Sequence, residues 1–160
     1  MIYEKADLGD TGALTELRIA YLKEDYGDIA EETLNHIAGK LPGYFREHLN
    51  KDLYAFVCRD ETIAGCCLLC VSEKPPNPSF INGKTGTVMN VYVKPQFRRK
   101  GIASALMKML IAESEKLGLD LVELKATDAG YRLYRSLGFE DAVSEYHSMK
   151  LIINRRSASR

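Results

Sequence analysis

The chain has 160 residues, of which 46% are hydrophobic and 28% are charged, and these values are typical of one soluble globular domain. A chain of this length buries roughly 70% of its unfolded surface, so it needs no disulfide or metal to fold. The longest apolar run, residues 64–71, is far shorter than the roughly 20 residues that cross a bilayer. The first ten residues contain acids where a signal peptide would need an apolar segment, so we expect a cytoplasmic protein without membrane partners.

The net charge is zero, but the charges are unevenly distributed along the chain. Residues 1–73 carry 14 acidic and 7 basic side chains, and residues 113–160 carry 8 of each. Residues 74–112 carry 7 basic side chains and no acid, which predicts that an anionic partner docks on the middle third. A pI near 6.8 and the few aromatic residues among these bases argue against nucleic acid.

Three of the four cysteines lie in the apolar segment IAGCCLLCV, which is typical of a buried strand. Cys67 and Cys70 form a C-x-x-C pattern, but residues three apart on a strand point to opposite faces. Such a pair can neither form a disulfide nor share a metal ion. We therefore expect free, buried thiols and no metal site.

The first half of the chain predicts a short strand and a set of helices. The strand covers residues 2–6, and a helix capped by Asp10 or Thr11 follows it and ends near Gly27. A second helical stretch starts near residue 30. Because proline and glycine interrupt helices, Pro42-Gly43 predicts a break there, with a further short helix over residues 44–50.

The second half predicts strands that alternate with helices. In order, we expect strands 53–59, 62–72 and 87–93, a helix from Gly101 to Gly118, a strand over 119–124, a helix over 129–137, and one or two closing strands over 139–153. The hairpin predicts antiparallel pairing, and the strand–helix–strand unit predicts a parallel crossover. The expected fold is α/β (α+β), a mixed sheet with helices on its faces. One domain covers residues 1–153, with a frayed tail over 154–160.

The stretch from Val91 to Met107 carries the strongest functional signal. A strand leads through a short basic loop into a helix that begins at Gly101. The first turn of a helix has unpaired N–H groups and a positive dipole end, so this pattern predicts a diphosphate site. Gly83-Lys84-Thr85 is not a P-loop, because Pro78 stands where the first glycine belongs.

Two motifs resemble the signatures of the GCN5-related N-acetyltransferase (GNAT) superfamily. The acetyl-CoA signature Q/R-x-x-G-x-G/A is matched by the run Arg98-Arg99-Lys100-Gly101-Ile102-Ala103, and the Leu-Tyr-x3-Gly-Phe signature is matched by residues 133–139. The chain is most similar to bacterial members of unassigned substrate. This resemblance implies a mostly antiparallel central sheet, flanked by helices on both faces, in which one parallel pair of strands splays apart.

The resemblance also implies the roles of particular residues. The amides of residues 99–103, with the Ser104 hydroxyl nearby, would hold the diphosphate of acetyl-CoA, and main-chain groups of Val91 and Val93 would pair with its pantetheine arm. Tyr134 would be the catalytic residue, with its hydroxyl on the thioester sulfur. The cofactor-binding set is Val91, Tyr92, Val93, Arg98, Arg99, Lys100, Gly101, Ile102, Ala103 and Ser104. Thr127 and Gly130 depart from the usual Asn and Ala.

The expected activity is acetyl-CoA-dependent N-acetyl transfer to a primary amine of a small molecule by direct attack on the thioester. An ordinary tyrosine has a pKa near 10 and a thiol one near 8.5, so Tyr134 would stabilise the leaving thiolate mainly by hydrogen bonding. Arg132 or Arg135 could lower the pKa of Tyr134 if either pointed toward it. A backbone N–H around Tyr92 would stabilise the oxyanion.

The general base stays open among Glu73, Glu123, Asp128 and a water molecule held by Asn90, and Asp128 equally suits a helix cap. The acids Glu24, Asp25, Asp28, Glu31 and Glu32 could attract a cationic amine or form an ordinary solvated surface. As a third alternative, tyrosines could line an aromatic pocket for the acceptor.

Two other functions stay open: a non-catalytic acyl-CoA sensor and a protein or peptide N-acetyltransferase. The sequence decides neither the acceptor nor whether the acyl group is only acetyl. A homodimer is an open expectation, because members of the resembled superfamily are often dimers.

Overall fold

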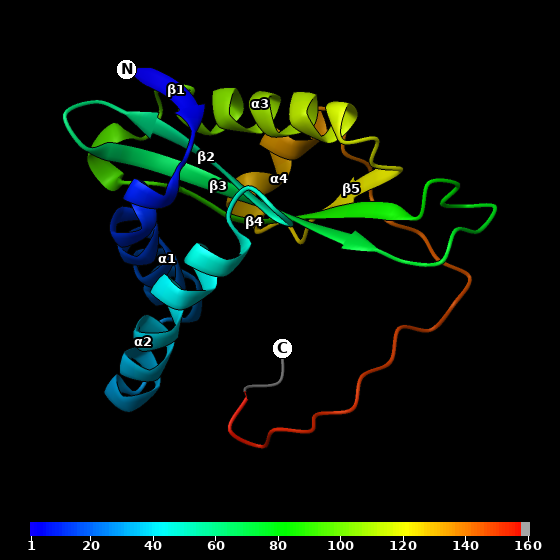
Figure 1. The fold of residues 1–160 in the computed structure, drawn as a ribbon, viewed down its shortest axis with the longest axis horizontal. Coiled ribbons are helices and arrows are strands. Elements are labelled where there is room, and N and C mark those ends of the chain that lie inside the picture. The colour runs from blue at the N-terminus through cyan, green and yellow to red at the C-terminus, as the bar shows by residue number, and fades with distance from the viewer. Residues whose placement is uncertain (158–160) are drawn as a thin grey trace.

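The computed structural model describes residues 1–157 and contains one five-stranded sheet in the order β1-β2-β3-β4-β5. The elements are β1 (Ile2–Lys5), α1 (Thr11–Tyr26), α2 (Glu31–His48), β2 (Leu53–Arg59), β3 (Ile63–Glu73), β4 (Lys84–Val93), α3 (Ile102–Lys116), β5 (Leu121–Glu123) and α4 (Asp128–Ser136) (Figure 1). Every neighbouring pair of strands is antiparallel except β4 and β5, which are parallel. The predicted α/β class and mixed, mostly antiparallel sheet are confirmed.

The sheet has helices on both faces, as expected: α1 and α2 lie on one side and α3 and α4 on the other (Figure 1). On the first side, Leu14, Leu17 and Phe45 are almost fully buried. On the second, Leu106 and Leu110 of α3 are fully buried. The apolar stripe of each helix thus faces the sheet, and the hydrophobic effect fixes the layers.

Strand β4 bends where it leaves β5. The two strands pair over only three residues each, from Thr85↔Leu121 to Thr87↔Glu123. Beyond that, the register between β3 and β4 shifts, and Asn90 has a left-handed φ of 53°. A β-bulge adds a residue to one strand and increases its local bend, so β4 diverges from β5 and opens the sheet.

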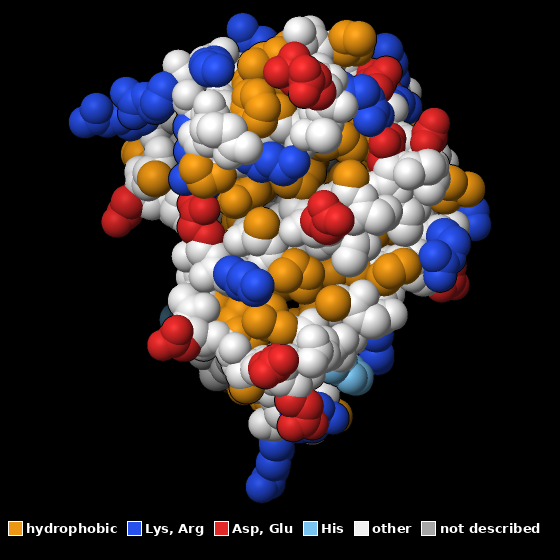
Figure 2. All heavy atoms as spheres, turned by 90° about the vertical axis from the view of Figure 1, so that its left-hand side faces the viewer, with side chains coloured by type: hydrophobic (Ala, Val, Ile, Leu, Met, Phe, Trp, Pro, Cys, Tyr) orange, Lys and Arg blue, Asp and Glu red, His pale blue; other side chains and the backbone are white. Residues whose placement is uncertain are grey.

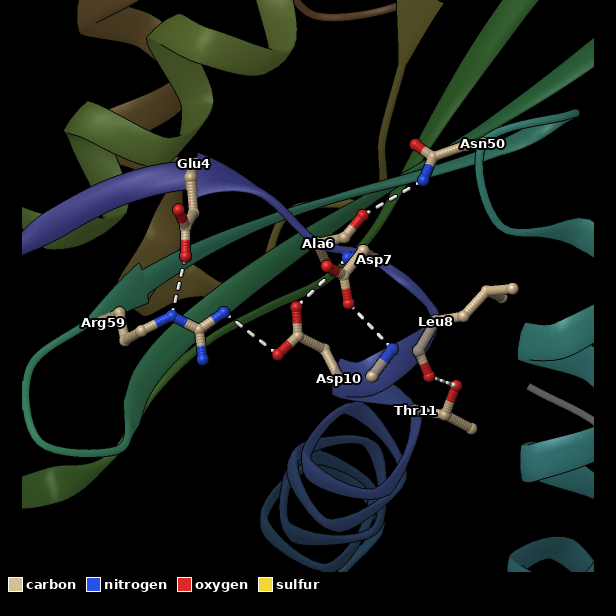
Figure 3. Close-up of polar contacts among 9 residues, drawn as sticks. Glu4, Ala6, Asp7, Leu8, Asp10, Thr11, Asn50 and Arg59 are labelled. Atoms are coloured by element: carbon tan, nitrogen blue, oxygen red, sulfur yellow. Dashed lines mark hydrogen bonds and ion pairs between the residues drawn. The ribbon is translucent and has the colours of Figure 1, made fainter.

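Polar contacts join the start of the chain to the sheet (Figure 3). Arg59 of β2 donates to Glu4 Oε1 at 2.6 Å and to Asp10 Oδ1 at 3.0 Å. Asp7 accepts from the Gly9 N–H at 2.7 Å, and its own N–H donates to Asp10 Oδ2 at 3.1 Å. These contacts fix where α1 begins and how it meets the sheet.

The predicted break at Pro42 is wrong, because α2 runs without interruption from residue 31 to residue 48. A proline inside a helix removes one hydrogen bond, to the carbonyl four residues earlier, but packing can hold the axis. Leu41 packs against the first core and Phe45 is 1% exposed, so both sides of Pro42 are fixed by the sheet.

The predicted closing strands over residues 139–153 are also wrong: no strand forms in this segment, and beyond Phe139, which packs against the second core, the chain runs away from the sheet (Figure 1). Val143 is 94% exposed and Met149 is 92% exposed. A strand forms only against a partner edge, and β5 offers an edge of three residues. Of the predicted tail 154–160, residues 158–160 lie outside the described residues, and Arg156 lies 3.9 Å from Glu32.

The four cysteines are free. Cys58, Cys66 and Cys67 are buried, whereas Cys70 is partly exposed. Cys67 belongs to the core under α3 and Cys70 packs against the opposite core, so the expected opposite orientation is confirmed. Within residues 1–157, none of the helices combines the length and apolar character that crossing a membrane would need.

Candidate functional site

The turn between β4 and α3 exposes the first amides of the helix. Arg99 has a φ of 64° and Gly101 a φ of 76°, a conformation that glycine adopts without strain. No side chain caps α3, and a Cβ at position 101 would have no atom within 4 Å. Because the first N–H groups of a helix lack intrahelical partners, the amides of residues 102–104 face open space. This arrangement suits an anion.

A cavity of about 670 Å³ lies beside this turn. Of the eleven residues expected at the site, only Lys100 does not line it; the others are Val91, Tyr92, Val93, Arg98, Arg99, Gly101, Ile102, Ala103, Ser104 and Tyr134. The Lys100 ammonium lies instead 5.5 Å from the centre of the Phe97 ring. The structure therefore brings the two sequence motifs together around one cavity.

The Arg98 side chain is partly exposed but is held in place by several contacts. It donates to Glu24 Oε2 at 2.6 Å and to the Val93 carbonyl at 2.8 Å, and its guanidinium lies 5.5 Å from the Tyr92 ring centre. Glu24 thus neutralises its charge, so Arg98 fixes the turn between β4 and α3 against α1. Arg99 also lines the cavity, but it differs from Arg98 because no carboxylate within residues 1–157 forms an ion pair with it.

The backbone of β4 directs alternate groups toward the cavity. The Lys94 N–H donates to the Ala64 carbonyl at 2.9 Å, toward β3. Because backbone groups of a strand alternate between its two edges, those of Val91 and Val93 point toward the opening beside β5. The Tyr92 amide therefore faces β3, and any oxyanion donor from β4 would be the amide of Val91 or Val93.

Tyr134 of α4 is half-buried and packs edge-on against Phe139, with ring centres 6.0 Å apart. Burial, with smaller contributions from nearby Tyr21 and Cys67, raises the pKa of Tyr134 to about 12. Neither Arg132 nor Arg135 brings the pKa of Tyr134 below its ordinary value. The hydroxyl is therefore protonated throughout the physiological pH range and can donate a hydrogen bond.

Gly130 lets the Tyr134 ring lie close to the backbone of α4. A Cβ at position 130 would lie 2.8 Å from Cε2 of Tyr134, too close for both to keep their places. The Thr127 hydroxyl caps α4 by accepting from the Gly130 N–H at 3.3 Å, so the cap is Thr127 and not Asp128. The two departures from the family motifs thus act together to position Tyr134.

A second cavity, of about 630 Å³, lies between α1 and the point where β4 and β5 separate. It shares Tyr21, Asp25 and Thr127 with the first cavity, so the two spaces meet at these three residues, whereas Tyr134 lines the first cavity alone of the two. Figure 2 shows one end of the molecule, where hydrophobic side chains gather in hollows between charged residues of both signs.

The candidate general bases fall in different places. Glu73 lies 3.6 Å from Lys84 at the far end of β3, and neither it nor Asp128 lines either of the two cavities. Glu123 and Asn90 both line the second cavity. The Asn90 side chain is buried and donates to Cys66 Sγ at 3.4 Å.

Residues 13–139 match the model of the acetyltransferase (GNAT) family. This chain belongs to the GNAT family. The match begins at the third residue of α1 and covers both motifs and every later helix and strand through α4. Members of the family use acetyl-CoA, and the chain is an acyltransferase by family.

Similar proteins support the same assignment. An uncharacterized N-acetyltransferase of Schizosaccharomyces pombe is 30% identical over 145 residues, which cover 89% of this GNAT chain and 82% of the relative. The [ribosomal protein bS18]-alanine N-acetyltransferase of Escherichia coli is 41% identical over 59 residues, or 35% of this chain and 40% of the relative. A crystal structure of a predicted acetyltransferase with acetyl-CoA from Clostridium acetobutylicum superposes with a TM-score of 0.81 at 24% identity, covering 96% of this chain and 98% of the other. This last likeness shows the shared fold.

Sequence reasoning missed Arg18, which lines the second cavity. A signal was present: Arg18 lies four residues after Leu14 and four before Leu22, within the apolar stripe of α1. A charged residue on a buried helix face requires a partner or a function. Of the five acids in the run after it, only Glu24 and Asp25 line either cavity.

Proposed function

We propose that this GNAT protein is an acetyl-CoA-dependent N-acetyltransferase that acetylates a primary amine of a small molecule. One observation carries the proposal: an uncapped helix start opens onto a cavity that is lined by the protonated Tyr134 and that meets a second cavity at Tyr21, Asp25 and Thr127. The first cavity suits a long anionic donor, and the second suits a separate acceptor. Two joined cavities are what a transfer reaction between two bound molecules requires.

The residues present fit acetyl-CoA. The amides of residues 102–104 and the Arg99 side chain would hold its diphosphate. The outward main-chain groups of Val91 and Val93 would pair with the pantetheine amides, although the Val93 carbonyl already accepts from Arg98. When bound, acetyl-CoA supplies the acetyl thioester.

The proposed reaction is a direct transfer. The amine nitrogen forms a bond to the acetyl carbon, the carbon–sulfur bond breaks, and the sulfur keeps its electron pair. The nitrogen then releases its surplus proton to water, which leaves a neutral amide and a thiolate. The amine must lose a proton to act as a nucleophile, because a primary amine with a pKa near 10.4 is mostly protonated at pH 7. Glu123 or a water molecule held by Asn90 stays available for this step, since both residues line the second cavity.

Tyr134 acts on the leaving sulfur as a hydrogen-bond donor. Its pKa of about 12 is well above the value near 8.5 of an ordinary thiol, so full proton transfer to the thiolate is unfavourable. A hydrogen bond still stabilises the developing negative charge, since charge-assisted hydrogen bonds are about twice as strong as neutral ones. The amides of Val91 and Val93 point toward the space in which an oxyanion would form.

A protein N-terminus is the second candidate acceptor, since one relative is named as a ribosomal-protein alanine N-acetyltransferase. That match covers 35% of this chain, so it favours a shared donor site more than a shared acceptor. The second cavity, of about 630 Å³, has the size of a small-molecule pocket. The size of this cavity favours a small amine.

The test is a thiol-release assay with acetyl-CoA over a panel of small amines, amino acids and alanine-terminated peptides. Turnover on small amines with little on peptides is the expected result. Preferential turnover on peptides would support the second candidate. Tight acetyl-CoA binding without acetylation of any acceptor would contradict both and favour an acyl-CoA sensor.

A further inference from the structure

The second cavity contains a guanidinium without a carboxylate partner. Arg18 is half-buried, and its Nη1 donates to Asn90 Oδ1 at a long 3.4 Å. Its guanidinium carbon lies 5.7 Å from the centre of the Tyr21 ring. Within residues 1–157, no carboxylate oxygen lies within 4 Å of the nitrogen atoms of the Arg18 guanidinium.

Two other arginines show what a satisfied guanidinium looks like in this protein. Arg59 and Arg98 each have a carboxylate at 2.6 Å, and Arg59 is intermediate in exposure, as Arg18 is. Arg18 has five N–H donors, as they do, but the acceptor that its side chain has within residues 1–157 is the neutral amide oxygen of Asn90, at the limit of a hydrogen bond. A half-buried cation with spare donors on a cavity wall is suited to an anionic ligand.

The wall of the second cavity, taken as a whole, carries charges of both signs. Asp25 and Glu123 are acidic, and Arg18 and Lys125 are basic, so the charged residues of the wall sum to zero. Asp25 lies where the two cavities meet, and after burial it is the main cause that raises the pKa of Tyr21. The anionic group of the wall nearest the reaction centre is therefore Asp25, and Arg18 lies two helical turns earlier on α1.

This distribution does not suit a polycation. Glu24 of the acidic run is already paired with Arg98, and Asp28, Glu31 and Glu32 do not line either cavity. A polyamine or aminoglycoside would meet the positive charges of Arg18 and Lys125 along with Asp25 and Glu123. A molecule with one positive and one negative group would instead find a charge of opposite sign on the wall for each of its groups.

We propose that the second cavity binds the acceptor as an amino acid, with its carboxylate on the Arg18 guanidinium and its amine beside Tyr21, Asp25 and Thr127. Arg18 is then a specificity residue. Asp25 attracts the amine to the point where the cavities meet, and Arg18 selects amines that carry a carboxylate. This inference rests on the proposed N-acetyltransferase function and narrows its acceptor.

The test compares amines that differ only in their carboxylate. Thiol release from acetyl-CoA is measured with α- and ω-amino acids, their methyl esters, and the amines that lack the carboxylate carbon. We expect kcat/KM to be at least about 10-fold higher for one or more free amino acids than for the matched ester. Arg18→Gln should raise KM for that amino acid about 10- to 100-fold and leave the ester nearly unchanged. Arg18→Lys keeps the charge and should recover part of the loss.

Lys23→Gln is the matched control, because Lys23 is an exposed base on the same helix outside both cavities. This substitution should leave kcat/KM unchanged for both the amino acid and its ester. Equal kcat/KM for acid and ester, or a preference that survives Arg18→Gln, would overturn the inference while the proposed function stands.

A binding measurement separates the two claims if no acetylation is seen. Calorimetric titration of the same amino acids into the protein saturated with CoA should show binding that Arg18→Gln abolishes. No binding of any amino acid would overturn the inference. Binding without acetylation would support the carboxylate site and contradict the proposed catalytic function.

Discussion

The two cavities meet at the same three residues but are built from different parts of the chain. The donor-side cavity depends on main-chain groups: the uncapped start of α3, a left-handed Gly101 and the outward edge of β4. The acceptor-side cavity depends on charged side chains from α1, from β5 and from the segment that follows it. A backbone site needs few particular residues, whereas a side-chain site changes with each substitution. We therefore expect the donor side to be generic for the family and the acceptor side to define this protein.

The strongest test of this contrast is Gly101→Asp. An aspartate there places a carboxylate where the diphosphate would bind, and we expect acetyl-CoA affinity to fall by about 100-fold or more. Gly118→Asp is the matched control, because Gly118 also has a positive φ, of 67°, and open space around it at the other end of α3. Calorimetry should show normal acetyl-CoA affinity for Gly118→Asp. Equal losses in the two variants would mean that backbone strain, and not the anion site, explains the effect.

Tyr134→Phe tests the hydroxyl that lines the donor-side cavity. Removing the hydroxyl should lower kcat by about 10- to 100-fold, because one hydrogen bond to the leaving sulfur is lost. The dissociation constant of acetyl-CoA should change by less than about 3-fold, since the backbone site is intact. With a pKa of about 12 for Tyr134, kcat should not decline between pH 7 and 9 through ionisation of this residue. An unchanged kcat in the variant would remove Tyr134 from the mechanism.

Gly130→Ala should separate stability from activity. Alanine favours the helical conformation over glycine by about 1 kcal/mol, which would stabilise α4. Its Cβ would, however, displace the Tyr134 ring, which lies within 2.8 Å of that position, and kcat should fall about 10-fold. Thermal melting and steady-state kinetics measure the two effects. Gly12→Ala in α1, where a Cβ would have open space, should stabilise without loss of kcat.

The smallest expected effect concerns the core beneath the acceptor-side cavity. Burial raises the pKa of the Cys66 thiol to about 12, from an ordinary value near 8.5. Between these values the unfolded chain releases this proton and the folded chain keeps it, so stability is full below pH 8.5 and falls as the pH rises toward 12. We expect Tm to drop by about 5 °C between pH 8 and 10.5, and by less in Cys66→Ala.

Val57→Ala is the control for this last prediction, because Val57 is the buried cross-strand partner of Cys66 and does not titrate. The Tm of Val57→Ala should be lower than that of the wild type at every pH, but it should fall with rising pH by the same amount. If Cys66→Ala and the wild type lose stability in parallel, the thiol does not cause the pH dependence.

The donor side could be predicted from the sequence because its physics is local. A strand, a basic loop and Gly101 at a helix start lie within about twenty consecutive residues, and the helix dipole follows from the backbone alone. The orientation of Arg98 could not be predicted, since its partner Glu24 comes from α1, 74 residues earlier. The same holds for the amide that faces the opening, because the bulge at Asn90 and the pairing with β3 determine it.

The two errors in the fold have a shared cause. Local preference predicts a break at Pro42 and strands in the segment 139–153, but contacts with the rest of the chain decide both. The core keeps α2 continuous through the proline, whereas the predicted strands of residues 139–153 would have only the short edge of β5 to pair with. Arg18 was missed for the same reason: its meaning depends on which carboxylates are absent around it in space.

The most direct test of the central claim is a crystal structure with bound acetyl-CoA. We expect diphosphate oxygens about 3 Å from the amide nitrogens of Ile102 and Ala103, with the thioester sulfur near the Tyr134 hydroxyl. Electron density for the diphosphate away from the start of α3, or no bound acetyl-CoA at saturating concentration, would contradict the account.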